Sequence, residues 1–354
     1  PLAARLDGIQ ILRGLAALAV LVSHLWVIES KYSPDQIMGS WALLGATGVD
    51  LFFVISGFIM VYVTQSRGRA HNKPLGFLAG RALRIYPLYW VVSIALLLVW
   101  VIYPEVVFSS AVGEPSIVKS FALWPDSREP LLAVGWTLIH EMYFYLVFTL
   151  IILFAHKWRL VLLSLWMGAV VIGNLMGLST LSPETALIFH PLSMEFFMGA
   201  VCAWLFLSGY KSGGGIMVAL GLLGWLAAII YLVTLPQLYF PVGWDRILLF
   251  GLPAALLTYG VACLEFKGRI LPKWSEIFGN WSYSLYLTHV LALSVLGYLW
   301  RPFARDGVID NIIMLPVLVI GAIIIGALTY YIFERTLLRV TKALRKRWFK
   351  AAKT

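Results

Sequence analysis

Residues 43–63 read LLGATGVDLFFVISGFIMVYV, and one of these side chains, that of Asp50, carries a charge. A helix of this length rises about 30 Å, which is the thickness of the hydrocarbon core of a bilayer. The whole chain has the same character, since 61% of its 354 residues are hydrophobic and only 12% are charged. Soluble domains carry about a quarter charged residues. A single globular core cannot hide so much apolar surface, and the composition therefore excludes a soluble single domain.

Ten apolar runs of this kind follow one another along the chain, each long enough to span a membrane. They cover residues 9–28, 43–63, 85–103, 131–155, 159–177, 187–208, 215–235, 246–264, 280–300 and 312–333. The sequence therefore predicts an all-α, polytopic membrane protein with about ten transmembrane helices. We expect a single transmembrane domain over residues 1–354, ending in a basic amphipathic cytoplasmic tail over residues 333–354.

Basic residues alternate between the segments that join these spans. With the N-terminus in the cytoplasm, the inner segments hold 20 of the 27 lysines and arginines. The outer segments hold Lys31, Lys119, Arg128, Arg246, Arg301 and Arg305. The positive-inside rule therefore predicts that both termini are cytoplasmic. The rule also accounts for the net charge of +10, and we expect no nucleic-acid partner.

The predicted spans contain ionisable side chains, which are costly there and usually functional, and six of these are candidates for a site. They are Arg13, His24, Asp50, Glu141, Glu195 and His289. Arg13 and His24 are eleven residues apart, which on a helix puts them on one face, about 16 Å apart along the axis. This spacing suits a cavity that is reached from both sides of the membrane. The alternatives are that Arg13 snorkels to the headgroups and that His24 is a packing residue.

Two arginines, Arg81 and Arg84, lie one helical turn apart at the predicted inner end of the third span. Guanidinium groups bind phosphate oxygens in pairs, so these arginines indicate a site for a phosphorylated cytosolic cofactor. Arg67, Arg69 and Lys73 add positive charge nearby. The alternative is that all these charges only set the topology of the chain.

Glu141 shares a predicted helix face with Tyr145, four residues further on. The Glu141 carboxylate is placed to pair with His24 or Arg13 across the bundle and to hold the imidazole in its useful tautomer. The alternative is a structural buried pair, which is the interpretation we favour for Glu195. His289 ends a polar stretch, and it either lines a cavity or packs.

Other kinds of chemistry have no support in the sequence. It contains no Gly-x-Ser-x-Gly elbow, no Walker loop, no His-x-x-x-His pair and no Cys-x-x-Cys pair. Cys202 and Cys263 both lie in apolar runs and are predicted to be buried thiols. We therefore expect neither a metal site nor a nucleotide-triphosphate site.

Five stretches of the sequence, in this order, resemble the integral-membrane acyltransferase-3 family. They are most similar to its bacterial exopolysaccharide O-acetyltransferase branch. The stretches are IQILRGLAA (9–17) with His24 following, GVDLFFVISGF (48–58), RALRIYP (81–87), WTLIHEMYFYL (136–146) and SYSLYLTH (282–289). Two positions depart from the family pattern, since Thr137 replaces a common serine and His140 precedes the glutamate.

The resemblance implies a role for each matching residue. His24 corresponds to the family's catalytic histidine, Arg13 to its paired arginine and Glu141 to the glutamate of the fourth span. Arg81 and Arg84 correspond to the arginine pair linked to the acyl-coenzyme A donor. The implied activity is transfer of an acetyl group from cytosolic acetyl-CoA to a hydroxyl of an exported or cell-surface polysaccharide, or of its lipid-linked precursor. The implied location is the bacterial inner membrane.

Other functions fit the same residues. Intramembrane charges around a cavity would also serve a transporter or flippase of a lipid-linked glycan. Within the enzyme class, the donor is open between acetyl-CoA and a succinyl donor, and the acceptor between a glycan and a macrolide. The sequence leaves open whether the acyl group passes directly to the acceptor or first onto His24, and it does not give the oligomeric state.

Overall fold

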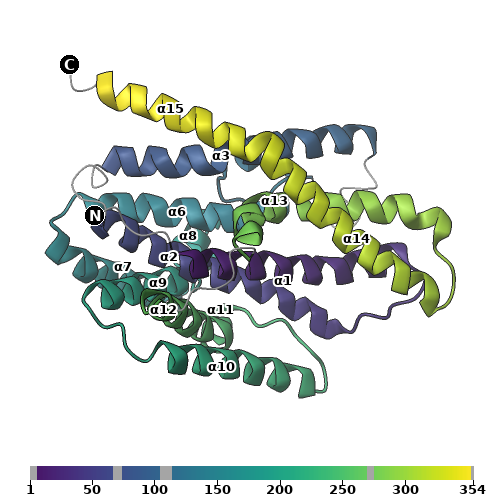
Figure 1. Cartoon of the computed structure of the whole chain (residues 1–354), viewed down its shortest axis with the longest axis horizontal. Helices are drawn as coiled ribbons and strands as arrows, with labels where there is room; N and C mark the ends of the chain where they lie inside the picture. The colour runs from purple at the N-terminus through teal and green to yellow at the C-terminus, as the bar shows by residue number, and fades with distance from the viewer. Residues whose placement is uncertain (1–5, 67–73, 104–113, 269–274, 352–354) are drawn as a thin grey trace. The chain divides into compact units, whose positions relative to one another are not determined.

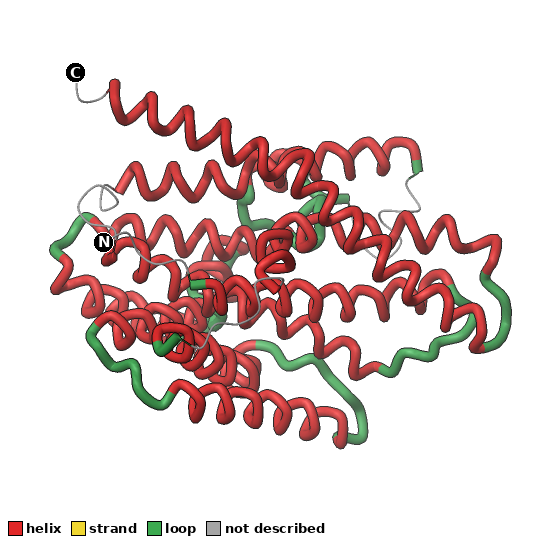
Figure 2. The backbone as a smooth tube through the Cα atoms, in the orientation of Figure 1, coloured by secondary structure: helices red, strands yellow, loops and turns green. Residues whose placement is uncertain are grey.

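The computed structural model describes residues 6–66, 74–103, 114–268 and 275–351. All regular secondary structure in these ranges is helical, and they contain no strand (Figure 2). Ten segments of this part of the chain are long and apolar enough to cross a membrane. Each overlaps one of the ten predicted spans, so the prediction of an all-helical, multi-pass membrane protein is confirmed. The side of the membrane on which the termini lie stays a prediction.

The helices follow the order seen in Figure 1. Their bounds are α1 (Asp7–Tyr32), α2 (Gly48–Ser66), α3 (Pro74–Ile102), α5 (Ile117–Ala122), α6 (Gly135–Ile152), α7 (Arg159–Leu175), α8 (Pro183–Ile188), α9 (Ser193–Leu207), α10 (Gly214–Thr234), α11 (Gly243–Arg246), α12 (Leu252–Phe266), α13 (Ser275–Trp300), α14 (Val308–Thr329) and α15 (Arg335–Ala351). A 3₁₀ segment, Ser40–Thr47, precedes α2. Single π-helical turns join α11 to α12 and α14 to α15.

One predicted span is interrupted. The sequence predicts a single helix over residues 187–208, whereas the structure has two helices, α8 and α9, with four residues between them. Pro191 lies in this gap. Proline has no amide hydrogen to donate, and it disfavours the helical conformation of the residue before it, here His190. The apolar run therefore continues while the helix stops and restarts.

The basic tail predicted over residues 333–354 forms the helix α15. It continues from α14 through the π-helical turn Tyr330–Glu334, without a loop between them. The side chains beyond Leu344 lie outside those that the structure describes. The amphipathic character of the tail therefore stays a prediction.

The chain forms two compact units. Unit 1 comprises residues 1–16, 47–81 and 139–279, and unit 2 comprises residues 17–46, 82–138 and 280–354. Helices α1, α3, α6 and α13 each begin in one unit and end in the other. Arg13 and Glu141 belong to unit 1, whereas His24 and His289 belong to unit 2.

In unit 1, α2 packs closely on α9 through two glycines. A side chain at Gly57 would overlap the backbone carbonyl of Phe196, and one at Gly199 would overlap that of Val54. Small residues at such crossings let helix backbones approach within a membrane. The ring of Phe196 then stacks on that of Phe144 of α6, with centroids 4.4 Å apart. This contact ties α6 to the same core.

In unit 2, three aromatic side chains of α3 bind the short helix α5. The Tyr89 hydroxyl donates to the carbonyl oxygen of Ser120 at 2.7 Å, and the Tyr86 hydroxyl donates to that of Ala122 at 2.8 Å. The Trp90 indole donates to the carbonyl oxygen of Phe121 at 2.9 Å. The last carbonyls of a helix have no partner within it. Aromatic donors on α3 therefore cap a helix that is too short to be stable alone.

The chain that follows α1 in unit 2 is held by a buried carboxylate. Glu29 has no exposed surface, and it accepts the backbone N–H groups of Ile37 at 2.9 Å and Met38 at 3.1 Å. Its carboxylate also accepts the side-chain amide of Asn311 at 3.0 Å. Asn311 in turn donates to the carbonyl oxygen of Asp35 at 2.7 Å. We call this arrangement of Glu29 and Asn311 around residues 33–38 the loop clamp.

Candidate active site

Two histidines meet in unit 2. The ring nitrogen Nδ1 of His24, on α1, lies 3.2 Å from Nε2 of His289, on α13. The two rings are edge to face, with centroids 4.9 Å apart. His289 is fully buried, whereas His24 keeps some exposed surface. The structure therefore supports a His24–His289 pair, which the sequence alone did not predict.

Backbone oxygens fix which nitrogen of each ring carries hydrogen. Nδ1 of His289 lies 3.1 Å from the carbonyl oxygen of Leu285 and 2.8 Å from that of Tyr286. Carbonyl oxygens only accept, so Nδ1 of His289 is the donor and Nε2 of the neutral ring is an acceptor. Nδ1 of His24 faces this acceptor and also lies 3.0 Å from the carbonyl oxygen of Val20. The hydrogen of neutral His24 is therefore on Nδ1, which leaves a lone pair on Nε2.

A row of α13 side chains leads from this pair to Ile85 of α3. The Tyr286 hydroxyl, one turn before His289, lies 2.8 Å from the hydroxyl of Thr137. The Tyr283 hydroxyl, a further turn back, donates to the carbonyl oxygen of Ile85 at 2.8 Å. Ile85 directly follows Arg84. Tyr283 and His289 are six residues apart, or about 9 Å along the helix axis.

In unit 1, Glu141 lies in a polar cluster. The Ser56 hydroxyl of α2 donates to Glu141 Oε1 at 3.1 Å, and the Tyr145 hydroxyl donates to the same oxygen. The guanidinium of Arg81 lies over the ring of Tyr145, 5.9 Å from its centroid, and 5.5 Å from that of Phe77. The predicted shared face of Glu141 and Tyr145 is confirmed. We call Ser56, Arg81, Glu141 and Tyr145 the Glu141 cluster.

Arg13 is half-buried on α1 and donates to the side-chain oxygen of Gln10 at 3.2 Å. One helix carries both Arg13 and His24, as predicted. Pairing of Glu141 with His24 or Arg13 stays a prediction. Arg67, Arg69 and Lys73, the other basic residues expected near Arg84, lie outside the described residues.

Asp50 forms a buried ion pair and is not one of the residues of the Glu141 cluster. Its two carboxylate oxygens each accept from the Arg246 guanidinium, at 2.8 Å. Asp50 is fully buried and Arg246 is 7% exposed. The sequence analysis counts Arg246 among the outer loop charges, but the structure buries it as the partner of Asp50. Glu195 is fully buried beside this pair, and its structural role stays a prediction.

The remaining candidates add no reactive centre. Cys202 and Cys263 are free thiols; Cys263 is buried and Cys202 partly buried. Within the described ranges, no group of three or more histidines, cysteines or acids is arranged to hold a metal ion. The sequence did not single out Glu29 or Arg246, because Glu29 directly follows the first predicted span and Arg246 is the first residue of the eighth. Their positions next to the span ends are the only signal that could have found them.

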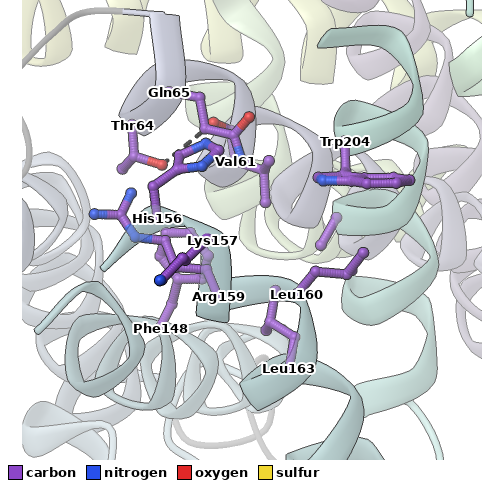
Figure 3. Close-up of a pocket in the computed structure, with 11 residues that line it drawn as sticks. Val61, Thr64, Gln65, Phe148, His156, Lys157, Arg159, Leu160, Leu163 and Trp204 are labelled. Atoms are coloured by element: carbon purple, nitrogen blue, oxygen red, sulfur yellow. Dashed lines mark hydrogen bonds between the residues drawn. The ribbon is translucent and has the colours of Figure 1, made fainter. Parts of the chain in front are cut away.

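Unit 1 also contains a small pocket near the end of α2 and the start of α7 (Figure 3). Its volume is about 60 Å³. In Figure 3, Thr64, Gln65, His156 and Arg159 gather on one side of it, and Trp204 lies on the other. We call this space the α2–α7 pocket.

The chain is similar to known proteins over most of its length. The family described as an acyltransferase domain matches residues 6–331. Exopolysaccharide production protein ExoZ of Rhizobium meliloti is 33% identical over 315 residues, which cover 85% of this chain and 92% of the relative. Acyltransferase MdmB of Streptomyces mycarofaciens is 27% identical over 337 residues, which cover 83% of this chain and 80% of the relative. No solved structure matches the chain significantly.

Proposed function

Because this chain belongs to the acyltransferase-3 family of integral membrane enzymes, we propose that it transfers an acetyl group from acetyl-CoA to a sugar hydroxyl. The acceptor is an exported or cell-surface polysaccharide, or its lipid-linked precursor, and the location is the bacterial cytoplasmic membrane. The observation that carries the proposal is the His24–His289 pair, in which His289 Nε2 lies 3.2 Å from His24 Nδ1. A histidine whose Nδ1 is committed in this way presents Nε2 as a general base.

In the proposed reaction, His24 takes up and returns one proton while a C–S bond is exchanged for a C–O bond. Nε2 of His24 takes the proton of the acceptor hydroxyl as its oxygen attacks the thioester carbonyl carbon. The new C–O bond forms and the C–S bond breaks, which releases the coenzyme A thiolate. The imidazolium of His24 then returns the proton to this thiolate, so the products are the acetyl ester and coenzyme A. Base catalysis of this kind contributes about 10²–10⁴-fold in rate.

Arg81 and Arg84 are the proposed contacts for the coenzyme A phosphates. Guanidinium groups suit phosphate because their planar donors bind two oxygens at once. Arg84 directly precedes Ile85, whose carbonyl oxygen accepts from Tyr283 of α13. We place the pantetheine arm beside the row from Tyr283 to His289, because this row links the residue after Arg84 to the partner of His24. Entry from the cytosol follows from the predicted topology.

Arg13 and Glu141 complete the proposed site. Arg13 stabilises the negative charge that develops on the thioester oxygen, a role that suits a fixed cation in a site of low dielectric constant. Glu141 balances the charge of the imidazolium that forms on His24. Support for the Glu141 role comes from the two hydroxyl donors, Ser56 and Tyr145, that keep its carboxylate oriented.

An exopolysaccharide acceptor is the proposal that the relatives support best. The printed name of the 33%-identical relative from Rhizobium meliloti describes a protein of exopolysaccharide production, and the match spans 92% of that protein. We propose an acetyl group, rather than another acyl group, because the sequence stretches resemble those of O-acetyltransferases.

The test is acetyl transfer by purified protein. Wild type and His24→Ala would be supplied with radiolabelled acetyl-CoA and with deacetylated exopolysaccharide, and both the free thiol released and the label on the glycan would be measured. We expect thiol release that depends on the glycan in wild type and a loss of at least about 100-fold in the variant. Binding of acetyl-CoA should persist in the variant. Full transfer by His24→Ala would refute the role of His24, and a wild type that moves lipid-linked glycan across vesicles without consuming acetyl-CoA would favour a flippase.

A further inference from the structure

The α2–α7 pocket is a second polar site in unit 1, and it is separate from the Glu141 cluster. Eleven residues line it, all within the described part of the chain, and none of them is acidic. Three of them are basic, namely His156, Lys157 and Arg159. Lys157 is exposed, whereas Arg159 is 7% exposed. The lining therefore concentrates positive charge around a partly open space.

The backbone adds to this charge. Helix α7 (Arg159–Leu175) follows directly on a 3₁₀ turn, His156–Trp158, and no side chain caps the start of either. The first N–H groups of a helix have no partner within it and give that end a partial positive charge, which favours an anion. Because His156 and Lys157, which open this helical segment, also line the pocket, side chains and backbone favour the same sign of ligand.

The size of the pocket limits what part of a ligand it can hold. A cavity of about 60 Å³ has room for several water molecules, since one needs about 10–15 Å³. That is enough for a phosphate group but not for a nucleotide. The opposite wall is apolar and aromatic, with Trp204 and Leu163 facing the basic side chains in Figure 3. The pocket therefore suits a phosphate that ends a larger, partly apolar molecule.

The pocket lies close to the Glu141 cluster. Thr64 of the pocket follows Ser56 of the cluster by eight residues on α2, which is about 12 Å along the axis. On α6, Phe148 of the pocket is one turn beyond Tyr145. Phe148 also contacts Phe77, with centroids 5.4 Å apart, and Phe77 lies under the guanidinium of Arg81. A single aromatic wall thus separates Arg81 from the pocket.

We propose that the α2–α7 pocket binds a phosphate group, with Lys157 and Arg159 as its main contacts. Resting on the proposed function, the first source of this phosphate is coenzyme A, held at the end remote from the thioester. The same chemistry would recognise the phosphodiester of an anionic lipid headgroup. The two sources share the basic contacts and differ in the molecule that carries the phosphate.

The experiment compares single charge removals. Lys157→Gln removes an exposed pocket charge with little effect on packing, and Arg159→Gln removes the buried one. Lys267→Gln is the matched control, because Lys267 is also exposed, lies on the same predicted side and does not line the pocket. Each detergent-purified protein would be titrated with acetyl-CoA and with dephospho-coenzyme A. Retention of phosphatidylglycerol would be measured by native mass spectrometry after extraction from vesicles of phosphatidylcholine and phosphatidylglycerol.

If the pocket holds a coenzyme A phosphate, the Kd for acetyl-CoA rises about fivefold or more in Lys157→Gln and stays unchanged in Lys267→Gln, as expected for loss of one charge-assisted contact. If it holds a lipid headgroup, acetyl-CoA binding is unchanged and phosphatidylglycerol retention falls in Lys157→Gln. Unchanged binding of both probes in folded Lys157→Gln and Arg159→Gln overturns the proposal. Should wild type bind no acetyl-CoA, the proposed function fails, and the lipid measurement alone decides for or against the phosphate site.

Discussion

The tautomer of His24 is defined by the acceptors around its Nδ1 atom, which are Nε2 of His289 and the carbonyl oxygen of Val20. Two backbone oxygens take the Nδ1 hydrogen of His289, so its Nε2 must accept the hydrogen from His24. This geometry makes His289 a positioning residue for the proposed base. Its contribution is to keep the lone pair on Nε2 of His24.

Replacing His289 should therefore slow the proposed reaction without weakening donor binding. We expect His289→Leu to lower kcat about tenfold or more, because the His24 Nδ1 hydrogen then keeps only the Val20 carbonyl oxygen as an acceptor and the ring is less well positioned. His289→Gln keeps an acceptor oxygen and should retain more activity than the leucine variant. Steady-state kinetics with acetyl-CoA would measure kcat and KM separately. A rise in KM with kcat unchanged, or equal activity of the two variants, would contradict a positioning role.

Asp50 and Arg246 should contribute to stability rather than to the reaction. Removing one partner of a buried ion pair leaves an uncompensated charge, at a cost of about 3–5 kcal/mol. We expect Asp50→Asn to lower the Tm in detergent strongly, whereas Asp50→Leu combined with Arg246→Met should recover much of the loss. Glu195→Gln, an isosteric change at a fully buried position beside the pair, would be compared with Asp50→Asn in the same measurement. A stable but inactive Asp50→Asn protein would instead point to a catalytic role.

At the scale of the helices, apolar run length predicted the existence and order of all ten spans. It did not predict where helices stop within a run, as α8 and α9 show, because that depends on the backbone chemistry of Pro191 rather than on hydrophobicity. Hydrophobicity also does not predict which helices are in contact. The contact between α2 and α9 depends on two glycines, and their sequence positions, 57 and 199, are far apart.

The α2–α9 contact should tolerate no added atoms. We expect Gly57→Ala to destabilise the protein by about 1–3 kcal/mol or more, because the new methyl group would overlap the carbonyl of Phe196. Gly168→Ala on α7 is the control, since nothing lies within 4 Å of its added carbon. The control should be neutral or stabilising, as alanine favours a helix. Thermal unfolding followed by tryptophan fluorescence would compare the two, and equal Tm values would show that α2 and α9 can move apart.

For the whole molecule, charge asymmetry is the basis for orientation. The six outer and twenty inner basic residues predict cytoplasmic termini. Burial of Arg246 removes one outer charge from the loops and so strengthens the asymmetry. No contact in the structure reports which side is which, so the orientation needs a measurement of its own.

Single cysteines can measure this orientation. In a background with Cys202 and Cys263 replaced by alanine, Ser127→Cys would report on a predicted outer loop and Ser212→Cys on a predicted inner one. Both serines are exposed. In spheroplasts, we expect a membrane-impermeant maleimide to label Ser127→Cys and to spare Ser212→Cys until the membrane is opened. The reverse pattern would place both termini outside and remove cytosolic acetyl-CoA from reach of Arg81 and Arg84.

The sequence named candidate site residues one by one, but it did not predict how they are grouped. It identified Glu141 and Tyr145 as neighbours, because four residues on a helix are one turn apart. It named His289 without deciding between a cavity and packing, since the partner of His289 lies 265 residues away in the sequence. Partners across a bundle depend on tertiary contacts, and one sequence contains no direct record of them.

The loop clamp has a consequence for how such a protein could diversify. Glu29 and Asn311 hold the backbone of residues 33–38 from its buried side, while the side chains of Gln36 and Ile37 are exposed. A segment whose shape is set by buried groups keeps that shape when its exposed side chains are exchanged. The surface of this segment can therefore change at positions 36 and 37 one substitution at a time while the buried clamp is kept.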